Sequence, residues 1–280
     1  MPYKAVIFDI GGVVVGSPIE GVGVAERRYG LPKHWINAAI TAMGDDGPFQ
    51  RFERSEISQE EFYREFGRRL SDVEANNAAY RKYCKRVGAS VPELPRSVQI
   101  DGKELWAMMM EPATEPDALV VNAINVLRTS KRYKVAALTN NFTPAGAVPA
   151  SRAEKASKPF RPVDVQDLRR SLKVGAGDEK GAGNDVMRSL FDDYIESCVE
   201  GLRKPDPRFF QLALDRLGVR AEETVFLDDI GHNLAAAAKM GIKTIRVNLG
   251  RSREALEELE RVLGMSLLTS RAEARVEAKL

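Results

Sequence analysis

The sequence predicts an α/β protein with a doubly wound parallel sheet and a helical cap inserted after the first strand. Short apolar runs that are typical of buried strands recur along the chain, and most are followed by a segment with helical spacing. Strands that alternate with helices favour a parallel sheet with helices on both faces. Helical spacing runs from about Gly21 to Leu70 and returns from Asp101 to Met110, with a charged, mixed segment between them, so residues 18–110 are expected to form a helical insertion between the first strand and the others.

The first strand is expected from Tyr3 to Phe8, a run with Val and Ile that ends at Asp9. Gly11 and Gly12 follow, and glycines allow a sharp turn and a close approach of the backbone to a ligand. Open α/β sheets bind ligands at the carboxyl ends of their strands, which favours a chemical role for Asp9. The alternative is that Asp9 only forms a turn.

The remaining core elements follow in alternation from residue 117. Pro207 in a first turn and Gly241 after a last turn support two of the helices. The strands are expected at Lys134 to Leu138, Tyr194 to Cys198, Thr224 to Leu227 and Thr244 to Val247; the helices are expected at Asp117 to Arg128, Pro207 to Leu217, Asn233 to Met240 and Arg253 to Val262.

The domain organisation follows from these patterns. We expect a core formed by residues 1–17 and 111–280, and a helical cap at 18–110. Residues 143–185 are rich in Ala, Gly, Pro and Lys and lose periodicity, which predicts a flexible insertion with one helical turn near Val165 to Leu172.

Composition excludes several classes of protein. The 42 basic and 40 acidic residues give a net charge of +2, which offers no argument for nucleic acid or an anionic membrane as a partner. No apolar stretch approaches the length of a membrane span, and the chain starts directly with a strand, so no signal peptide is expected. Only Cys84 and Cys198 are present, which favours a reducing, cytoplasmic setting without a disulfide framework.

Four polar segments end or follow predicted strands, so they gather at one edge of the sheet. They are Asp9, Thr139-Asn140, Lys204-Pro205 and Asp228-Asp229. Together they supply a nucleophilic carboxylate, a hydroxyl, an amide, a cation and an acidic pair. This set suits phosphoryl transfer to an aspartate, with Mg²⁺ held by carboxylate oxygens.

The same segments resemble the motifs of the haloacid dehalogenase-like hydrolase superfamily. They appear in order as FDIGGVV, ALTNN, GLRKPDPRFF and VFLDDIGHN. More narrowly, IESCVEGLRKPDPRFFQLALDRLG and VFLDDIGHNLAAAAKMGIKTIRV are similar to the N-terminal phosphatase domain of soluble epoxide hydrolases and the related domain of an acyl-CoA dehydrogenase family member. This resemblance covers most of the chain except the insertion and parts of the helical segment, and it implies a Rossmann-like core with a cap.

The resemblance also implies roles for individual residues. Asp9 would be the nucleophile and a Mg²⁺ ligand, Lys204 would bridge Asp9 and the phosphate, and Gly11 would offer its backbone carbonyl to the metal. Asp229 would be the main ligand from the acidic pair, with Asp228 beside it. The phosphoryl oxygens would be bound by Thr139, Asn140 and Gly12.

One position departs from the family pattern. Active phosphatases of this superfamily usually carry a second aspartate two positions after the first, where it serves as general acid and base; here that residue is Gly11. General acid–base help is worth about 10² to 10⁴ in rate. The chain is then a slow phosphatase, has moved the role elsewhere, or has lost turnover.

The leading hypothesis is a Mg²⁺-dependent phosphatase of a small phosphate monoester, acting through an aspartyl-phosphate at Asp9, with a homodimer as one oligomeric option. A metal-independent 2-haloacid dehalogenase-type hydrolase is the first alternative, because such enzymes also lack the second aspartate. A catalytically silent binding protein is the second. A prenyl diphosphate enzyme is a weaker one, because the acidic stretch at Asp192 to Glu196 precedes a predicted strand and reads as structural.

Overall fold

The computed structural model describes residues 2–142, 160–177 and 184–268 of the chain. A five-stranded sheet in the order β3-β2-β1-β4-β5 forms its centre, and every neighbouring pair is parallel. The strands are β1 (Ala5–Phe8), β2 (Lys134–Thr139), β3 (Asp193–Glu196), β4 (Thr224–Asp228) and β5 (Lys243–Arg246). With the helical insertion after β1, the predicted fold class is confirmed.

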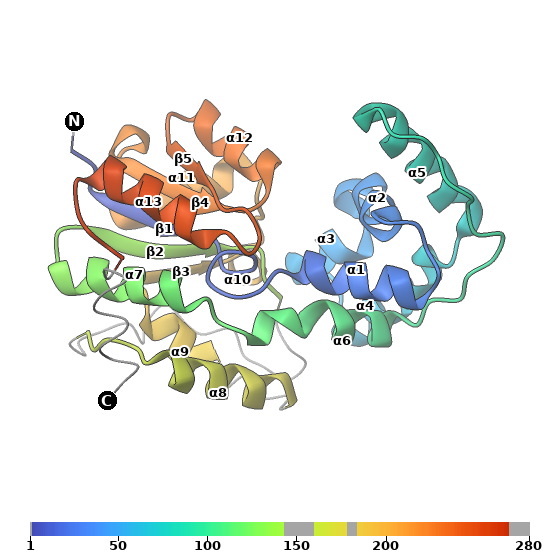
Figure 1. Cartoon of the computed structure of the whole chain (residues 1–280), viewed down its shortest axis with the longest axis horizontal. Coiled ribbons are helices and arrows are strands. Elements are labelled where there is room, and N and C mark those ends of the chain that lie inside the picture. The colour runs from blue at the N-terminus through green and yellow to red at the C-terminus, as the bar shows by residue number, and fades with distance from the viewer. Residues whose placement is uncertain (1, 143–159, 178–183, 269–280) are drawn as a thin grey trace.

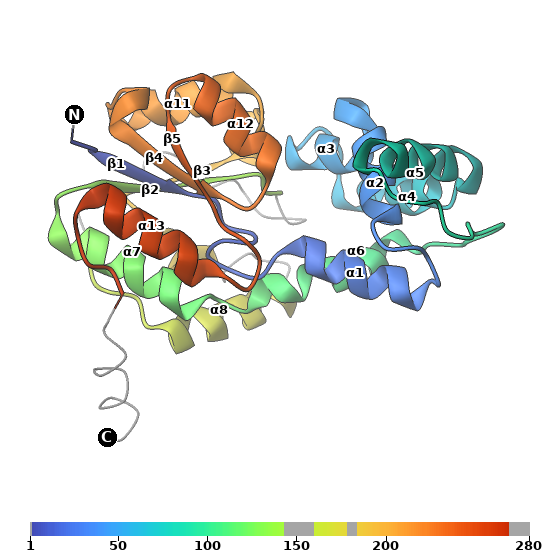
Figure 2. The same cartoon turned by 45° about the horizontal axis from the view of Figure 1, so that its top comes forward.

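Helices cover both faces of the sheet, as Figure 2 shows. Successive side chains of a strand point to opposite faces of the sheet. Because successive residues of these strands are apolar, both faces of the sheet are apolar. Val6 and Phe8 pack toward α7 (Ala118–Ser130) and α13 (Ser252–Leu263). Ala5 and Ile7 pack toward α11 (Pro207–Leu217) and α12 (Gly231–Lys239). This two-sided burial explains why the strands read as continuous apolar runs.

The segment predicted as a flexible insertion contains more helix than expected. Residues 143–159 and 178–183 of it lie outside the described residues, but α8 (Val165–Gly177) is longer than the single turn predicted, and α9 begins within it (Asn184–Ser189). Val165, Leu168 and Leu172 lie on one helical face and pack on the core, with Leu168 fully buried. This packing of an apolar face on the core stabilises α8.

The predicted strand Tyr194 to Cys198 was wrong for its last two residues. The strand ends at Glu196, and a short helix, α10 (Ser197–Glu200), follows. The Ser197 hydroxyl accepts a hydrogen bond from the N–H of Asn141 at 2.9 Å. The side chain of Ser197 thus joins the ends of β2 and β3, where the backbone ladder stops.

The cap lies beyond the carboxyl ends of the strands (Figure 1). Its helices are α1 (Pro18–Arg28), α2 (Trp35–Ala42), α3 (Pro48–Glu53), α4 (Gln59–Leu70), α5 (Val73–Val87) and α6 (Gly102–Met110), with the 3₁₀ turn η1 (Gly44–Asp46). They have an apolar cluster of their own, with Trp35, Phe62 and Phe66 fully buried. The 3₁₀ turn η2 (Pro112–Thr114) follows the cap and packs on the core through Ala113. A further 3₁₀ turn, η4 (Ala221–Glu223), leads into β4 of the core.

One core residue joins the cap cluster. Phe142, three positions after the end of β2, stacks on Phe52 of α3 with ring centroids 5.4 Å apart, and its ring meets Trp106 edge-on at 4.6 Å. Stacked and edge-to-face rings pack favourably over these distances. The segment that follows Thr139 is therefore anchored to the cap. Among the described residues, no helix is both long and apolar enough to cross a membrane.

Candidate active site

Three carboxylates meet at the carboxyl edge of the sheet. Asp9 follows β1, Asp228 ends the neighbouring strand β4, and Asp229 comes next in the chain. The register pairs Phe8 with Leu227, so Asp9 and Asp228 lie side by side. One oxygen of each carboxylate lies within 4.8 Å of one oxygen of the other two, and all three residues are buried.

Lys204 bridges two of these carboxylates. Its Nζ lies 2.8 Å from Asp9 Oδ1 and 2.8 Å from Asp228 Oδ2. The residue is only 1% exposed, which for a lysine requires partners of opposite charge. Burial alone would lower the pKa of Lys204, but Asp228 and Asp9 outweigh it and raise that pKa. Lys204 is therefore held as a cation at the centre of the site.

One carboxylate oxygen of Asp9 is held by hydrogen bonds from the protein. Its Oδ1 accepts the Lys204 ammonium and also the N–H of Ile10, at 2.7 Å. Among the described residues, no hydrogen bond is made by Oδ2, which leaves that oxygen open to a reacting atom. Burial raises the pKa of Asp9 well above its ordinary value, against the opposing effect of Lys204.

Asp228 is fully bonded. Its Oδ1 accepts the N–H of Ile230 at 2.7 Å and Nδ2 of Asn233 at 3.2 Å, and its Oδ2 accepts Lys204 and the same Nδ2 at 3.1 Å. Asn233 stands in the first turn of α12 and is 1% exposed. Asp228 therefore acts mainly to orient the ammonium of Lys204.

Asp229 is different, because its Oδ1 is buried and makes no hydrogen bond to the described residues. A buried carboxylate oxygen without a donor is costly unless a cation satisfies it. Its Oδ2 accepts the hydroxyl of Ser17 at 3.3 Å. Burial, with the charge of Asp228 second, raises the pKa of Asp229 to about 6.

Gly12 is required by this arrangement. Its φ of +79° lies in the left-handed region, and a Cβ atom there would overlap the carboxylate of Asp229. The preceding Gly11 carries no side chain into the site, and the turn continues with a 2.8 Å hydrogen bond from the Gly12 N–H to the Val15 carbonyl. The backbone of this turn therefore lies directly against the acidic pair.

Thr139 and Asn140 also lie at the expected edge. Thr139 ends β2, the strand beside β1, and is 4% exposed, with its hydroxyl 3.4 Å from the Asn140 carbonyl. The side-chain amide of Asn140 is already engaged. Its nitrogen and its oxygen are both hydrogen-bonded to the backbone of Lys204.

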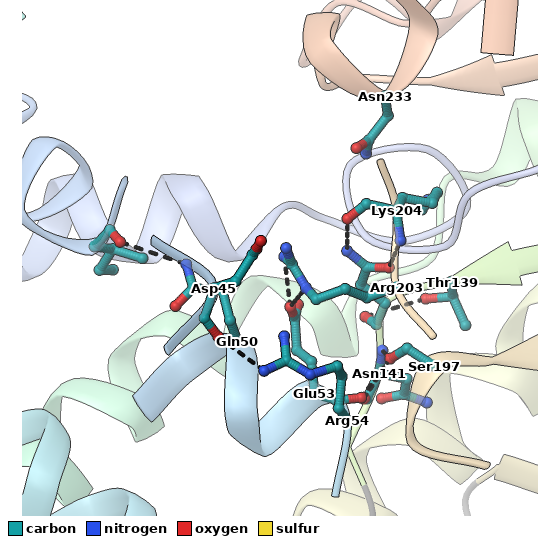
Figure 3. Close-up of polar contacts among 12 residues, drawn as sticks. Asp45, Gln50, Glu53, Arg54, Thr139, Asn141, Ser197, Arg203, Lys204 and Asn233 are labelled. Carbon is teal, nitrogen blue, oxygen red and sulfur yellow. Dashed lines mark hydrogen bonds and ion pairs between the residues drawn. The ribbon is translucent and has the colours of Figure 1, made fainter. Parts of the chain in front are cut away.

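The cap contributes a carboxylate at the same junction. Arg203, the neighbour of Lys204, reaches from the core to Glu53 of α3 (Figure 3), with Nε and Nη2 both 2.7 Å from Oε2. The Ser197 hydroxyl donates to the Glu53 carbonyl at 2.6 Å. Burial raises the pKa of Glu53, and Arg203 opposes that shift. Cap and core are joined beside the proposed catalytic lysine.

The structure therefore places Asp9, Gly12, Lys204 and the acidic pair against one another, with Gly11 in the adjoining turn and Thr139 and Asn140 at the same edge of the sheet. It adds three that the analysis did not assign: Ser17, Asn233 and Glu53. Ser17 could have been noticed as a helix N-cap before Pro18, and Asn233 as a polar residue close behind the acidic pair. Glu53 had no local signal, because its partner Arg203 is 150 positions away.

Oxygen donors dominate this site, which matches the ligand preference of Mg²⁺. Asp229 Oδ1 is the buried carboxylate oxygen of this site that the described protein groups leave without a hydrogen bond. Lys204 alone does not balance the three carboxylates, so a divalent cation would offset the remaining charge. The residues present fit a Mg²⁺ ion.

The sequence model of the haloacid dehalogenase-like hydrolase family matches residues 3–241, and the chain belongs to that family. Mouse acyl-CoA dehydrogenase family member 10 is 34% identical over 95% of this chain, and pig bifunctional epoxide hydrolase 2 is 29% identical over 97%.

These relatives are longer proteins. The chain spans 20% of the mouse protein and 41% of the pig protein. Among solved structures, a predicted HAD-like family hydrolase from Porphyromonas gingivalis is 19% identical and matches with a TM-score of 0.52, covering 95% of this chain and 100% of that one. That match shows the shared fold.

Proposed function

We propose that the protein is a Mg²⁺-dependent phosphatase of a small phosphate monoester, with Asp9 as nucleophile. The observation that carries the proposal is the buried Asp9 carboxylate, with Oδ1 held by Lys204 and Oδ2 open, beside the acidic pair. A carboxylate oriented by a cation and facing a site for a divalent ion suits attack on phosphorus.

The reaction then has two displacements. Asp9 Oδ2 attacks phosphorus, the bond from phosphorus to the alcohol oxygen breaks, and the leaving alcohol takes a proton from solvent, which leaves an aspartyl-phosphate. Water next attacks phosphorus, the bond from phosphorus to Asp9 Oδ2 breaks, and the water proton passes to solvent as inorganic phosphate leaves and Asp9 is freed. Lys204 holds Asp9 and offsets the charge of the phosphoryl oxygens, and the hydroxyl of Thr139 and the backbone at Gly12 bind those oxygens.

Asp9, Asp229 and the carbonyl of Gly11 would hold the Mg²⁺ ion, and Asp228, whose two oxygens are already hydrogen-bonded, would lie beside them outside the coordination shell. When bound, Mg²⁺ supplies charge stabilisation for the phosphoryl group. This assignment is supported by the free buried oxygen of Asp229.

The cap and core division is part of the proposal. Residues 1–17 and 111–280 form the core and residues 18–110 the cap, so that a substrate bound at Asp9 meets α3 and its Glu53. The apolar cap cluster and the contact of Phe142 with it support this division. The leaving group would lie between Thr139 and the cap.

The first experiment is hydrolysis of an aryl phosphate by the whole chain. We expect activity with Mg²⁺, loss of activity in EDTA, and loss in Asp9→Asn, whose amide is a poor nucleophile. Acid quenching should trap a phosphoenzyme in the unsubstituted protein alone. If the folded, Mg²⁺-bound protein neither hydrolyses any phosphate ester nor forms a phosphoenzyme, the phosphatase proposal is wrong.

A dehalogenase-type reaction is the second candidate, and Gly11 is the observation that favours it. There Asp9 would displace halide from a 2-haloacid and form an ester. The same protein should then release halide in EDTA. Because that chemistry has no use for the free oxygen of Asp229, Asp229→Asn would leave halide release unchanged.

A further inference from the structure

The side chain of Asn140 forms a closed pair of hydrogen bonds with the backbone of Lys204. Nδ2 donates to the Lys204 carbonyl at 3.0 Å, and the Lys204 N–H donates to Oδ1 at 2.8 Å. The two residues are 64 positions apart, in the loops that follow β2 and α10. Asn140 therefore binds the Lys204 backbone much as a neighbouring strand would.

Lys204 needs such support because it lies outside regular structure, between α10 and α11. Its long side chain must bring one ammonium to within 2.8 Å of both Asp9 and Asp228. The position of that ammonium depends on where the backbone at residue 204 is held. A site placed on a loop is precise only when neighbouring groups fix that loop.

The bonding capacity of the amide limits what else Asn140 can do. A side-chain amide has one carbonyl oxygen and two N–H donors. Oδ1 and one N–H are committed to Lys204, which leaves a single N–H for a phosphoryl oxygen. Direct substrate binding is therefore the smaller part of what this geometry supports.

We propose that Asn140 is a positioning residue, which fixes the backbone of Lys204 and thereby places its ammonium against Asp9. The proposal rests on the phosphatase function for its catalytic consequence only. It explains why an asparagine follows Thr139, because its amide holds the loop that carries Lys204. Misplacing a catalytic group by about 1 Å can cost about 10²-fold in rate.

The chain offers a matched control. Asn125 of α7 makes the same pair of bonds to the backbone of Val163, with Nδ2 donating at 2.9 Å and Oδ1 accepting at 3.0 Å. Both amides thus tie a loop through its backbone, but Val163 packs on the core behind the sheet. Asn125→Ala removes an equivalent structural contact without touching Lys204.

The test is a double-mutant cycle on phosphate ester hydrolysis. Asn140→Ala should lower kcat about 10²-fold with little change in KM, and Asn125→Ala should leave kcat unchanged. In a Lys204→Met background, where no ammonium remains to be placed, Asn140→Ala should cost less than about threefold. An equal loss in both backgrounds, or a loss confined to KM, would mean that Asn140 binds substrate directly and would overturn the proposal.

A second measurement does not depend on activity. Lys204 is buried, so reductive methylation followed by peptide mass spectrometry should find it protected. Asn140→Ala should increase its labelling severalfold, while Asn125→Ala should not. Unchanged protection in Asn140→Ala contradicts the positioning role even if the protein proves to have no phosphatase activity, so the two proposals fail separately.

Discussion

The Cδ atom of Pro18 lies 3.2 Å from the place that a Cβ atom on Gly11 would occupy. Gly11 does not have a positive φ, so its backbone alone would accept a larger residue. The ring of Pro18, at the first position of α1, is therefore what restricts a side chain at the place where related phosphatases carry a second aspartate. The first residue of the cap therefore crowds the position at which the acid is missing.

This contact predicts that Gly11→Asp alone will restore little general acid catalysis. Gly11→Asp combined with Pro18→Ala gives the new carboxyl room, and we expect kcat for an aryl phosphate to rise toward the about 10²- to 10⁴-fold typical of this catalysis. Pro18→Ala alone is the control, because alanine is also tolerated in a first helical turn. Equal rates for Gly11→Asp with and without Pro18→Ala would show that the ring is not the obstacle.

Within the acidic pair, Asp229 should mainly bind the metal and Asp228 should mainly orient Lys204. Asp229→Asn removes the carboxylate with the free buried oxygen, so Mg²⁺ affinity measured by calorimetry should fall by more than about 100-fold. Asp228→Asn disturbs a carboxylate already bonded to Lys204 and Asn233, and we expect the about 10- to 100-fold loss typical of residues outside the coordination shell. A larger loss in Asp228→Asn would reverse the assignment.

The metal-free protein should lose stability as the pH rises through 6. The pKa of Asp229 is raised to about 6 by burial in the folded chain, so the folded state binds this proton more tightly than the unfolded state does. The contribution of Asp229 is thus fully present below its unfolded pKa, declines as the pH rises to about 6, by at most about 3 kcal/mol, and levels off above that pKa.

That pH dependence is measured as the difference in free energy of unfolding between the unsubstituted protein and Asp229→Asn, in EDTA, from pH 4.5 to 7.5. The advantage of Asp229→Asn should grow with pH and should shrink when Mg²⁺ is added. A difference that stays constant across this range would mean that Asp229 is not desolvated in the folded protein.

The ion pair between Glu53 and Arg203 should stabilise the contact between the cap and the core. Its side chains are only 10% and 16% exposed, so Glu53→Gln or Arg203→Met leaves a mostly buried charge without its partner. Such losses cost about 3–5 kcal/mol in fully buried pairs, and we expect somewhat less here. Fluorescence of Trp106, which contacts Phe142, reports the junction.

The two substitutions together should cost less than the sum of the single losses, because they remove the same pair. Arg208→Gln is the control, since Arg208 belongs to an exposed pair with Asp206 on the same segment and should leave the thermal midpoint unchanged. Additive losses at Glu53 and Arg203 would indicate that each acts through other contacts.

Local patterns in the sequence determined the order of the elements and the edge at which the site forms. Helix α11 has the predicted bounds, and β1, β2, β4 and β5 lie within one or two residues of their predicted ends. Apolar periodicity and turn residues act over a few positions, which is why they can be read without a structure. Asp9, Thr139, Lys204 and the acidic pair followed from the ends of those elements and from the family resemblance.

Tertiary structure alone decided how those residues are held. Asn140 pairs with Lys204 across 64 positions, Glu53 with Arg203 across 150, and Ser17 with Asp229 across 212. Such partners depend on how the sheet and the cap pack, which no local pattern encodes. The same holds for α8, whose Leu168 packs in the core cluster of the sheet. A polar side chain acquires its role from the partner that packing places within hydrogen-bond distance.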